Sequence, residues 1–350
     1  DSNGTIQGQT SIAVSNPIIG SAVPLAVAAL GSATGTTTIT VATAAGEGDT
    51  LVATAGGSVV NGVFHVSSTA AGDEAALAGL KVIAGTGVTA PSFLVTLSGS
   101  AVSLTDSGAG SDVITTGGGD AIQTGSGTTT VAASLGDTIS AGSGSVFASG
   151  SQYFTFLGGS SAGDTVRGGA GGGSFTAGTG GHSQLIGGTG NTLLYAAGSN
   201  DTLTGGGASR LDASDNLPAV LHASGGDTVV GGDGSVVTGP VSGSATILAQ
   251  TGSETVVGSA GGMSVTEGTG KETFQFQSGL NNGEQVTING FVSDKDLITL
   301  SGYGSSAAQQ VVQTQVPTSG QVGTILTLPD GATITMLGLN AITHSSITSV

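Results

Sequence analysis

Acidic or amide side chains recur immediately before a Thr-apolar pair through the middle of the chain, in phrases such as GDTIS (136–140) and GDTVR (163–167). The polar residue of the phrase falls at Asp137, Asp164, Asn191, Asp227, Glu254 and Glu272. Every interval between successive copies is a whole number of nonapeptides, namely three, three, four, three and two. Calcium takes roughly six to eight oxygen ligands from carboxylates, backbone carbonyls and waters. The repeated carboxylates therefore predict a series of calcium sites.

Neighbouring turns extend this series of candidate ligands. GAGSDVI (108–114) is a complete Gly-rich turn that contains Asp112, and GGGDAI (117–122) is a shortened turn that contains Asp120. Asp201 lies one residue off the register, and many later turns carry Ser, Thr or Asn instead of an acid. The predicted metal ligands are Asp112, Asp120, Asp137, Asp164, Asp201, Asp227, Glu254 and Glu272.

Two pairs of these acids are separated by about one coil if two nonapeptides form a coil. Glu254 and Glu272 are two full nonapeptides apart, and Asp120 and Asp137 are one residue closer than that. Neighbouring parallel strands lie about 4.8 Å apart, so we expect each pair to stack and to share an ion. The alternative is that the acids are solvated turn residues in repeats that no longer bind calcium.

The elements that must position these acids follow from the period of nine. Each nonapeptide combines a Gly-rich turn, which tolerates positive φ, with a strand too short to bury an apolar face alone, so stacked units are needed to close a core. Two nonapeptides per coil predict an all-β fold, a parallel β-solenoid over residues 106–279. The predicted inward residues are Ile114, Ile122, Val131, Ile139, Val166, Phe175, Leu203, Val229 and Val256.

The repeat resembles the nonapeptide of RTX proteins, in which Gly-Gly-x-Gly-x-Asp turns bind calcium and a β-roll forms on binding. The resemblance covers roughly half of the chain, and its motifs here are degenerate. It implies calcium as the cofactor and a roll that folds when calcium binds.

Residues 1–105 have a different pattern, with short segments rich in β-branched residues between Gly, Asp and Pro. This pattern predicts a β-sandwich-like module. DEAALAGLKV (73–82) is similar to a phrase of cadherin-like or immunoglobulin-like modules in bacterial surface adhesins. The predicted strands are 36–43, 50–54, 63–68, 81–84 and 92–97.

Residues 280–350 resemble the segment that caps β-rolls in substrates of type I secretion. The resemblance lies in EQVTINGFVSDKDLITLSGY (284–303), with Glu284 or Gln285 in place of the usual first Asp. Two strands about a Pro-Asp-Gly turn follow within 323–339. The tail of small polar and aliphatic residues is similar to that family's secretion signal, so the resemblance implies export and a bacterial cell-surface or extracellular location.

Composition restricts the partners. The chain has 66 Gly and 3% aromatic residues, and Asp plus Glu outnumber Lys plus Arg by 22 to 5, which gives a net charge of −17. Such a charge repels nucleic acid and anionic lipid and attracts cations. Apolar runs such as 22–30 are too short to cross a membrane. The absence of Cys is consistent with a secreted protein that metal stabilises in place of disulfides.

We expect no enzymatic activity, because no set of residues suggests a catalytic site. The four His residues are scattered, without the HExxH spacing of a zinc site. The five Lys and Arg residues are too dispersed to line a polysaccharide-cleaving groove. Residues 1–105 contain a single His and no Ser-His-Asp set.

Two function classes remain. The first is an extracellular, calcium-stabilised structural or adhesive protein that forms a homo-oligomer or polymer, as in a surface layer, fibre or biofilm matrix. The second is a carbohydrate-binding or enzyme-accessory module for cell-surface polysaccharide; such modules usually carry aromatic ladders, whereas Tyr153, Tyr195 and Tyr303 share no register. Ice binding would require regular Thr rows, and the Thr run at 128–130 is not repeated. Residues 5–14 read as a strand that pairs either with a neighbouring copy or within its own module.

Overall fold

The computed structural model of the chain describes residues 13–14, 23–24, 28–29, 37–43, 50–53, 58–61, 63–68, 80–83, 92–98, 102–106, 109–160, 163–214, 217–250, 252–279, 285–318 and 321–350. The protein divides into two compact units, which comprise residues 1–180 and 181–350. The predicted all-β class and parallel β-solenoid are confirmed, and each unit contains a solenoid section.

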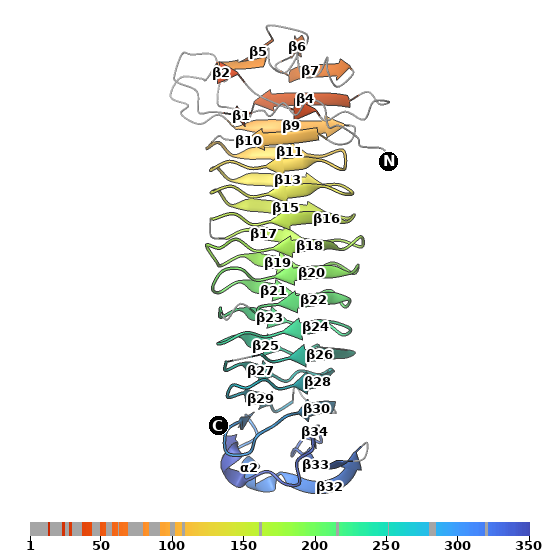
Figure 1. The fold of residues 1–350 in the computed structure, drawn as a ribbon, viewed down its shortest axis with the longest axis vertical. Helices are drawn as coiled ribbons and strands as arrows, with labels where there is room; N and C mark the ends of the chain where they lie inside the picture. The colour runs from red at the N-terminus through yellow and green to blue at the C-terminus, as the bar shows by residue number, and fades with distance from the viewer. Residues whose placement is uncertain are drawn as a thin grey trace, which may run out of the picture. The chain divides into compact units, whose positions relative to one another are not determined.

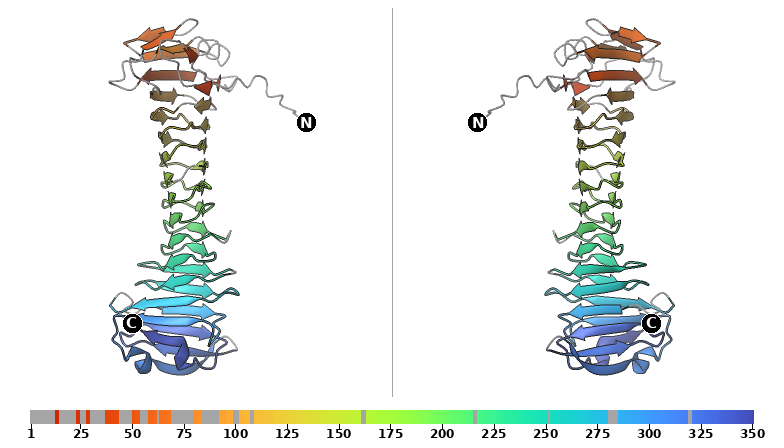
Figure 2. Two further views of the ribbon diagram at one scale, coloured as in Figure 1. Left: turned by 90° about the vertical axis from the view of Figure 1, so that its left-hand side faces the viewer. Right: turned by 90° about the vertical axis from the view of Figure 1, so that its right-hand side faces the viewer.

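In unit 1, consecutive short strands alternate between two parallel sheets (Figure 1). Figure 2 shows these strands nearly end-on, as two facing stacks. The first sheet contains β10 (Val102–Asp106), β12 (Ala121–Gln123), β14 (Thr138–Ser140), β16 (Phe154–Leu157) and β18 (Gly173–Thr176). The second sheet contains β9 (Phe93–Ser98), β11 (Asp112–Thr115), β13 (Thr129–Ala133), β15 (Val146–Gly150) and β17 (Thr165–Arg167).

Strand pairing in unit 1 confirms a coil of two strands and about two nonapeptides. Ile114 pairs with Val131, one residue short of that step, whereas Phe156 pairs with Phe175, one residue beyond it. The turns absorb these differences, so the inward side chains stay aligned. All nine predicted inward residues, in both units, are buried.

Glycine is required where turns of consecutive coils touch backbone to backbone. A Cβ on Gly127 would lie 1.7 Å from the Gly110 carbonyl oxygen, and a Cβ on Gly144 would lie 1.8 Å from the Gly127 carbonyl oxygen. Any side chain at these positions would force the coils apart.

The five strands predicted before residue 100 are present as β4 (Thr37–Thr43), β5 (Thr50–Ala53), β7 (Val63–Ser68), β8 (Leu80–Ile83) and β9. β4 lies antiparallel between β9 and β7, and β7 pairs with β6 (Ser58–Val60). β8 joins β5 and β2 (Val23–Pro24) in a separate antiparallel sheet. Because β9 also pairs in parallel with β11, this antiparallel group continues directly into the solenoid.

The predicted strand at 5–14 is described only at β1 (Ala13–Val14), and residues 5–12 lie outside the described residues. β1 pairs in parallel with β10, which also pairs with β3 (Ala28–Ala29). At residues 13 and 14 the pairing is therefore within the chain, but the partner is a solenoid strand and not a strand of the predicted sandwich.

Unit 2 contains the same two-sheet arrangement. Its first sheet contains β20 (Thr192–Tyr195), β22 (Ser209–Asp212), β24 (Thr228–Val230), β26 (Ser244–Leu248), β28 (Gly262–Thr266) and β30 (Gln285–Asn289). Its second sheet contains β19 (Gln184–Ile186), β21 (Thr202–Thr204), β23 (Val220–His222), β25 (Val236–Thr238), β27 (Thr255–Val257), β29 (Thr273–Gln277), β31 (Leu297–Ser301) and β35 (Ile347–Ser349).

The last coils of unit 2 are longer than the others. Leu203 pairs with Leu221, two nonapeptides on. In contrast, the pairing of Val265 with Ile288 spans five residues more than two nonapeptides, and that of Phe274 with Ile298 spans six more. The additional residues lie between the strands, so β30 and β31 still stack in register. The segment predicted as a cap thus contributes a further coil.

The C-terminal strands close this end of unit 2. The predicted hairpin about Pro-Asp-Gly is confirmed, with β33 (Gln321–Thr327) antiparallel to β34 (Thr333–Leu337) and to β32 (Val312–Thr318). The Tyr303 hydroxyl donates to Asp330 Oδ2 at 2.6 Å. Helical structure is limited to α2 (Ala307–Gln310) and the 3₁₀ turn η1 (His344–Ser346), and within the described ranges no helix is long and apolar enough to span a membrane.

Candidate metal centre

Each of the eight predicted ligands immediately precedes or begins a solenoid strand, at the corner where a turn enters the strand. All eight are buried, with 4% or less of their surface exposed. The part of the alternative that makes these acids solvated is therefore wrong, whereas its other part, that the repeats no longer bind calcium, stays a prediction.

The Asp227 side chain shows what a buried acid does at such a corner. Its Oδ2 accepts a hydrogen bond from the Ser224 N–H of its own turn at 2.7 Å. Its Oδ1 accepts from the N–H groups of Ser209, at 2.7 Å, and Gly207, at 3.0 Å, both in the preceding coil. One carboxylate thus satisfies backbone donors of two coils, and Oδ1 has both lone pairs occupied.

Asp137 in unit 1 repeats this arrangement. Its Oδ1 accepts from the Asp120 N–H at 2.8 Å, and its Oδ2 accepts from the Ser134 N–H at 2.6 Å and from the Thr116 hydroxyl. The predicted stacking of Asp120 and Asp137 is present, because Ala121 pairs with Thr138. The contact between them is a backbone donor to a carboxylate.

Other predicted ligands follow the same rule, and we call Asp112, Asp137, Asp164, Asp201 and Asp227 the carboxylate ladder. The N–H groups of Phe93, Val146 and Ser183, each in the preceding coil, donate to the Oδ1 atoms of Asp112, Asp164 and Asp201 at 2.7–3.0 Å. Where the corner lacks an acid a hydroxyl replaces it, since Ser235 Oγ accepts from the Ala219 N–H at 3.2 Å.

Hydrogen bonding of this kind offsets the cost of burial. Burial raises the pKa of Asp201, whereas the backbone hydrogen bonds from Ser183 and Gly198 lower it. The ladder therefore acts as a set of internal acceptors that join neighbouring coils.

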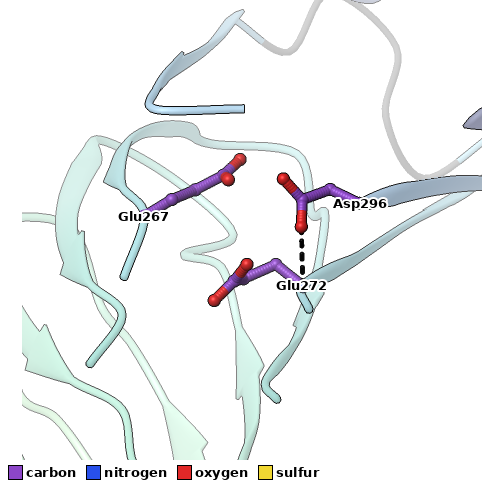
Figure 3. A group of neighbouring side chains, drawn as sticks. All are labelled: Glu267, Glu272 and Asp296. Atoms are coloured by element: carbon purple, nitrogen blue, oxygen red, sulfur yellow. Dashed lines mark hydrogen bonds between the residues drawn. The ribbon is translucent and has the colours of Figure 1, made fainter. Parts of the chain in front are cut away.

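A different arrangement occurs near the end of the unit 2 solenoid, where Glu267, Glu272 and Asp296 form what we call the acidic cluster. Glu267 directly follows β28, Glu272 directly precedes β29, and Asp296 directly precedes β31. One carboxylate oxygen from each lies within 4.8 Å of the others. Figure 3 shows the Glu267 and Asp296 carboxylates pointing toward each other, with the Glu272 carboxylate beside them.

A tight turn between β28 and β29 brings the two glutamates together. A Cβ on Gly268 would lie 1.5 Å from the Gln250 carbonyl oxygen, and a Cβ on Gly270 would lie 1.0 Å from the Gly252 carbonyl oxygen. Only glycine fits against the preceding turn at these positions, so the backbone reverses closely enough for both flanking glutamates to face inward.

The hydrogen bonding of the acidic cluster is uneven. Asp296 Oδ1 accepts from the Glu272 N–H at 3.1 Å, and Oδ2 accepts from the Val292 N–H at 2.7 Å. In contrast, both carboxylate oxygens of Glu267 and of Glu272 are buried without a hydrogen-bond partner. The partly exposed Lys295 ammonium lies 4.0 Å from Glu272 Oε2.

The neighbouring acid Glu254 also lacks a hydrogen-bond donor at one of its carboxylate oxygens. Glu254, which stacks on Glu272 through the Thr255–Thr273 pair, accepts from the Gln250 N–H at Oε1, but its Oε2 has no partner. The sequence predicts an ion shared by Glu254 and Glu272, and the structure adds Glu267 and Asp296 to the neighbourhood of Glu272.

Burial and the close approach of the carboxylates raise the pKa values of both glutamates in the acidic cluster. Burial, followed by the Asp296 and Glu272 carboxylates, raises the pKa of Glu267 to about 9. Burial, followed by Asp296, raises the pKa of Glu272 to about 7. Protonation would let either glutamate donate to Asp296, whereas a cation would stabilise all three ionised groups.

Sequence reasoning missed Glu267 and Asp296 as ligands. Asp296 lies further from Glu272 than two nonapeptides and so falls outside the register, although Asp296-Leu-Ile matches the phrase Glu272-Thr-Phe. Glu267 follows its strand instead of preceding it. Its close spacing to Glu272 across a Gly-Thr-Gly turn was the available signal.

Comparison with protein-family models, with curated proteins and with solved structures finds no match to this chain.

Proposed function

We propose that this chain is an extracellular structural protein of a bacterial cell surface or matrix, a calcium-stabilised β-solenoid that associates with copies of itself. The solenoid fold and the resemblance of its repeats to RTX nonapeptides support the class. The resemblance of residues 284–303 to caps of type I secretion substrates supports the route of export. One feature of unit 1 carries the proposal of self-association.

That feature is a line of outward side chains on the second sheet of unit 1, which we call the outer column. Pairing aligns one residue from each of five consecutive strands of this sheet, and three of the five are large apolar residues. Leu94 is 46% exposed, Val113 44% and Phe147 48%. The outer column consists of Leu94, Val113, Thr130, Phe147 and Thr165.

The neighbouring line of outward residues on the same sheet is small and mostly uncharged. Pairing aligns Thr96, Thr115, Ala132, Ser149 and Arg167, of which only Arg167 carries charge. Exposed apolar side chains that line up over several strands are typical of interaction surfaces.

Charge permits a second copy as the partner for this face. Copies with a net charge of −17 repel one another, so close contact requires a surface without acids. Pairing at sheet edges is a weaker alternative. The edge strand β6 is short, and the edge strand β32 contains Pro317, which cannot donate to a ladder.

The double variant Val113→Asp/Phe147→Asp tests this face. Light scattering and electron microscopy with calcium should show multimers of the wild type and monomers of the variant. The matched control is Leu157→Asp on the first sheet of unit 1, where Leu157 is also exposed.

Assembly that persists in the double variant, or a wild type that stays monomeric at high concentration with calcium, would refute self-association through this face. If the double variant instead loses retention on cell-surface polysaccharide while the wild type remains monomeric, the carbohydrate-binding alternative takes its place.

A further inference from the structure

We infer that Glu267, Glu272 and Asp296 bind one hard divalent cation, with calcium the best fit, and that this ion joins two consecutive coils of unit 2. The inference rests on the calcium stabilisation in the proposed function and locates the ion. It also separates this site from the carboxylate ladder, where the repeat pattern predicted most of the ligands.

The first observation is the separation of the carboxylates. Oxygens bound to one calcium ion lie about 2.3–2.6 Å from it, so two ligands on opposite sides of the ion are about 5 Å apart. One oxygen from each member of the acidic cluster lies within 4.8 Å of the others. All three can therefore bind the same ion with little movement.

The second observation is independent of that separation. Glu272 is fully buried, and neither of its carboxylate oxygens has a hydrogen-bond partner. Figure 3 shows this carboxylate beside those of Glu267 and Asp296, and one oxygen of each lies within 4.8 Å of the others. Buried charge is retained in proteins when it is paired or when it coordinates metal. The carboxylates of the ladder are paired with backbone N–H groups, whereas Glu272 has no such donor, so a metal ion is the partner that it lacks.

The donor atoms indicate the class of cation. Every ligand in the acidic cluster is a carboxylate oxygen, which favours calcium, magnesium or manganese over zinc or copper. Magnesium prefers to keep several of its waters, whereas these carboxylate oxygens are buried. Calcium, which is larger and more flexible in its ligand geometry, fits better.

Charge balance supports a divalent ion. The three carboxylates contribute three negative charges, and Lys295 is the one cation within 4.0 Å of them among the residues that the structure describes. A divalent ion and Lys295 together neutralise the group.

The position of the ligands gives the ion a structural consequence. Glu267 and Glu272 flank the turn between β28 and β29, whereas Asp296 belongs to the turn that leads into β31 in the next, longer coil. An ion between them would hold the C-terminal coil against the repeat before it.

The test is calorimetric titration of calcium chloride into the chelator-treated full chain. The cluster variants are Glu267→Gln, Glu272→Gln and Asp296→Asn, and each should weaken binding by about tenfold or more. Two controls remove other acids of unit 2: the exposed Asp233→Asn and the ladder variant Asp227→Asn. Both should bind calcium with wild-type affinity. Magnesium chloride should bind more weakly.

Hydrogen exchange gives a readout of location and of folding. Calcium should slow amide exchange in residues 262–301 of the wild type, and should not do so in Glu272→Gln. Circular dichroism in chelator identifies any variant that fails to fold. Because glutamine lacks the buried charge but keeps the shape, Glu272→Gln is expected to remain folded.

Wild-type calcium affinity in Glu267→Gln and Glu272→Gln would overturn the inference. So would loss of binding in Asp227→Asn with retention in Glu272→Gln, since that result places the ion in the ladder. The outcome is separable from self-association: a chain that binds calcium at the acidic cluster and stays monomeric refutes only the assembly proposal. Multimers that form without binding at the cluster refute only this inference.

Discussion

Asp227 and Glu272 occupy the same kind of corner, yet their carboxylates have opposite surroundings. Asp227 accepts three backbone hydrogen bonds from two coils, whereas Glu272 is equally buried and accepts none. The neighbours of Asp227 are N–H groups, and those of Glu272 are carboxylates and a distant ammonium.

The difference shows that a repeated acid in a Gly-rich turn does not have one fixed role. An Asp side chain is short enough to stay against the turn backbone, where it replaces water as the acceptor. The longer Glu272 side chain extends past the turn and meets Glu267. The same position of the repeat therefore serves as an internal hydrogen-bond acceptor in one coil and, in our proposal, as a metal ligand in another.

The largest expected effect comes from removing an acceptor of the ladder. Asp227→Ala leaves the N–H groups of Ser209, Gly207 and Ser224 without their acceptor, so unfolding free energy should fall by about 3–5 kcal/mol. Urea denaturation in chelator measures the change. The exposed Asp233→Ala is the control, and a loss below about 1 kcal/mol in Asp227→Ala would contradict the role assigned to the ladder.

A smaller effect of opposite sign is expected in the acidic cluster. Without calcium, Glu272→Gln removes a buried charge that lacks a donor, so unfolding free energy should rise by about 1–3 kcal/mol. With calcium the wild type should regain or exceed this difference. Thermal unfolding in chelator and in calcium gives both values, and destabilisation of the variant in chelator would show that Glu272 has a stabilising partner.

The pH dependence should differ between the two regions as well. Glu272 and Glu267 have folded-state pKa values of about 7 and about 9, above the ordinary value of 4.5. Groups with a raised pKa contribute stability at low pH that is lost as pH rises through the folded value. The chelated protein should therefore lose on the order of 1–2 kcal/mol per pH unit between pH 5.5 and about 8.5.

Thermal unfolding of the chelated protein across this pH range is the measurement. The double variant Glu267→Gln/Glu272→Gln should show a flatter profile over the same range. An equal slope in the wild type and the double variant would assign the titration to other groups.

The smallest effect is expected for Lys295. Its ammonium is partly exposed and 4.0 Å from Glu272, so Lys295→Met should cost about 0.5–1 kcal/mol in chelator. Titration calorimetry should still show calcium binding. Complete loss of binding would mean that Lys295 orders the site rather than neutralises it.

Much of the fold was predictable because its physical cause is local. Apolar residues at a regular spacing, such as Ile114 and Val131, must stack to be buried, and the pairing confirms that they do. The β-branched segments before residue 100 were also found as strands. The stacking of β30 and β31 was not predictable in this way, because the longer coils that lead into them break the period of nine.

The candidate site was predictable only in part. The corner positions of the acids follow from the register, and Glu272 was among the expected ligands. Their burial does not follow, because it depends on N–H groups in the preceding coil that sequence spacing does not show. Glu267 and Asp296 come together with Glu272 only through a Gly-Thr-Gly turn and an insertion, and both effects lie outside the repeat.

The hydrogen bonds that link one coil to the next also determine how unit 2 would respond to a pulling force. In the solenoid of this unit, backbone pairs and ladder carboxylates such as Asp227 connect each coil only to its neighbours. Tension applied at the C-terminal strands would therefore act on the terminal coil alone. The solenoid of this unit would unfold one coil at a time. An ion held by Glu267, Glu272 and Asp296 would resist separation of the terminal coil from the coil before it. The force needed to begin unfolding would then depend on the calcium concentration around the protein.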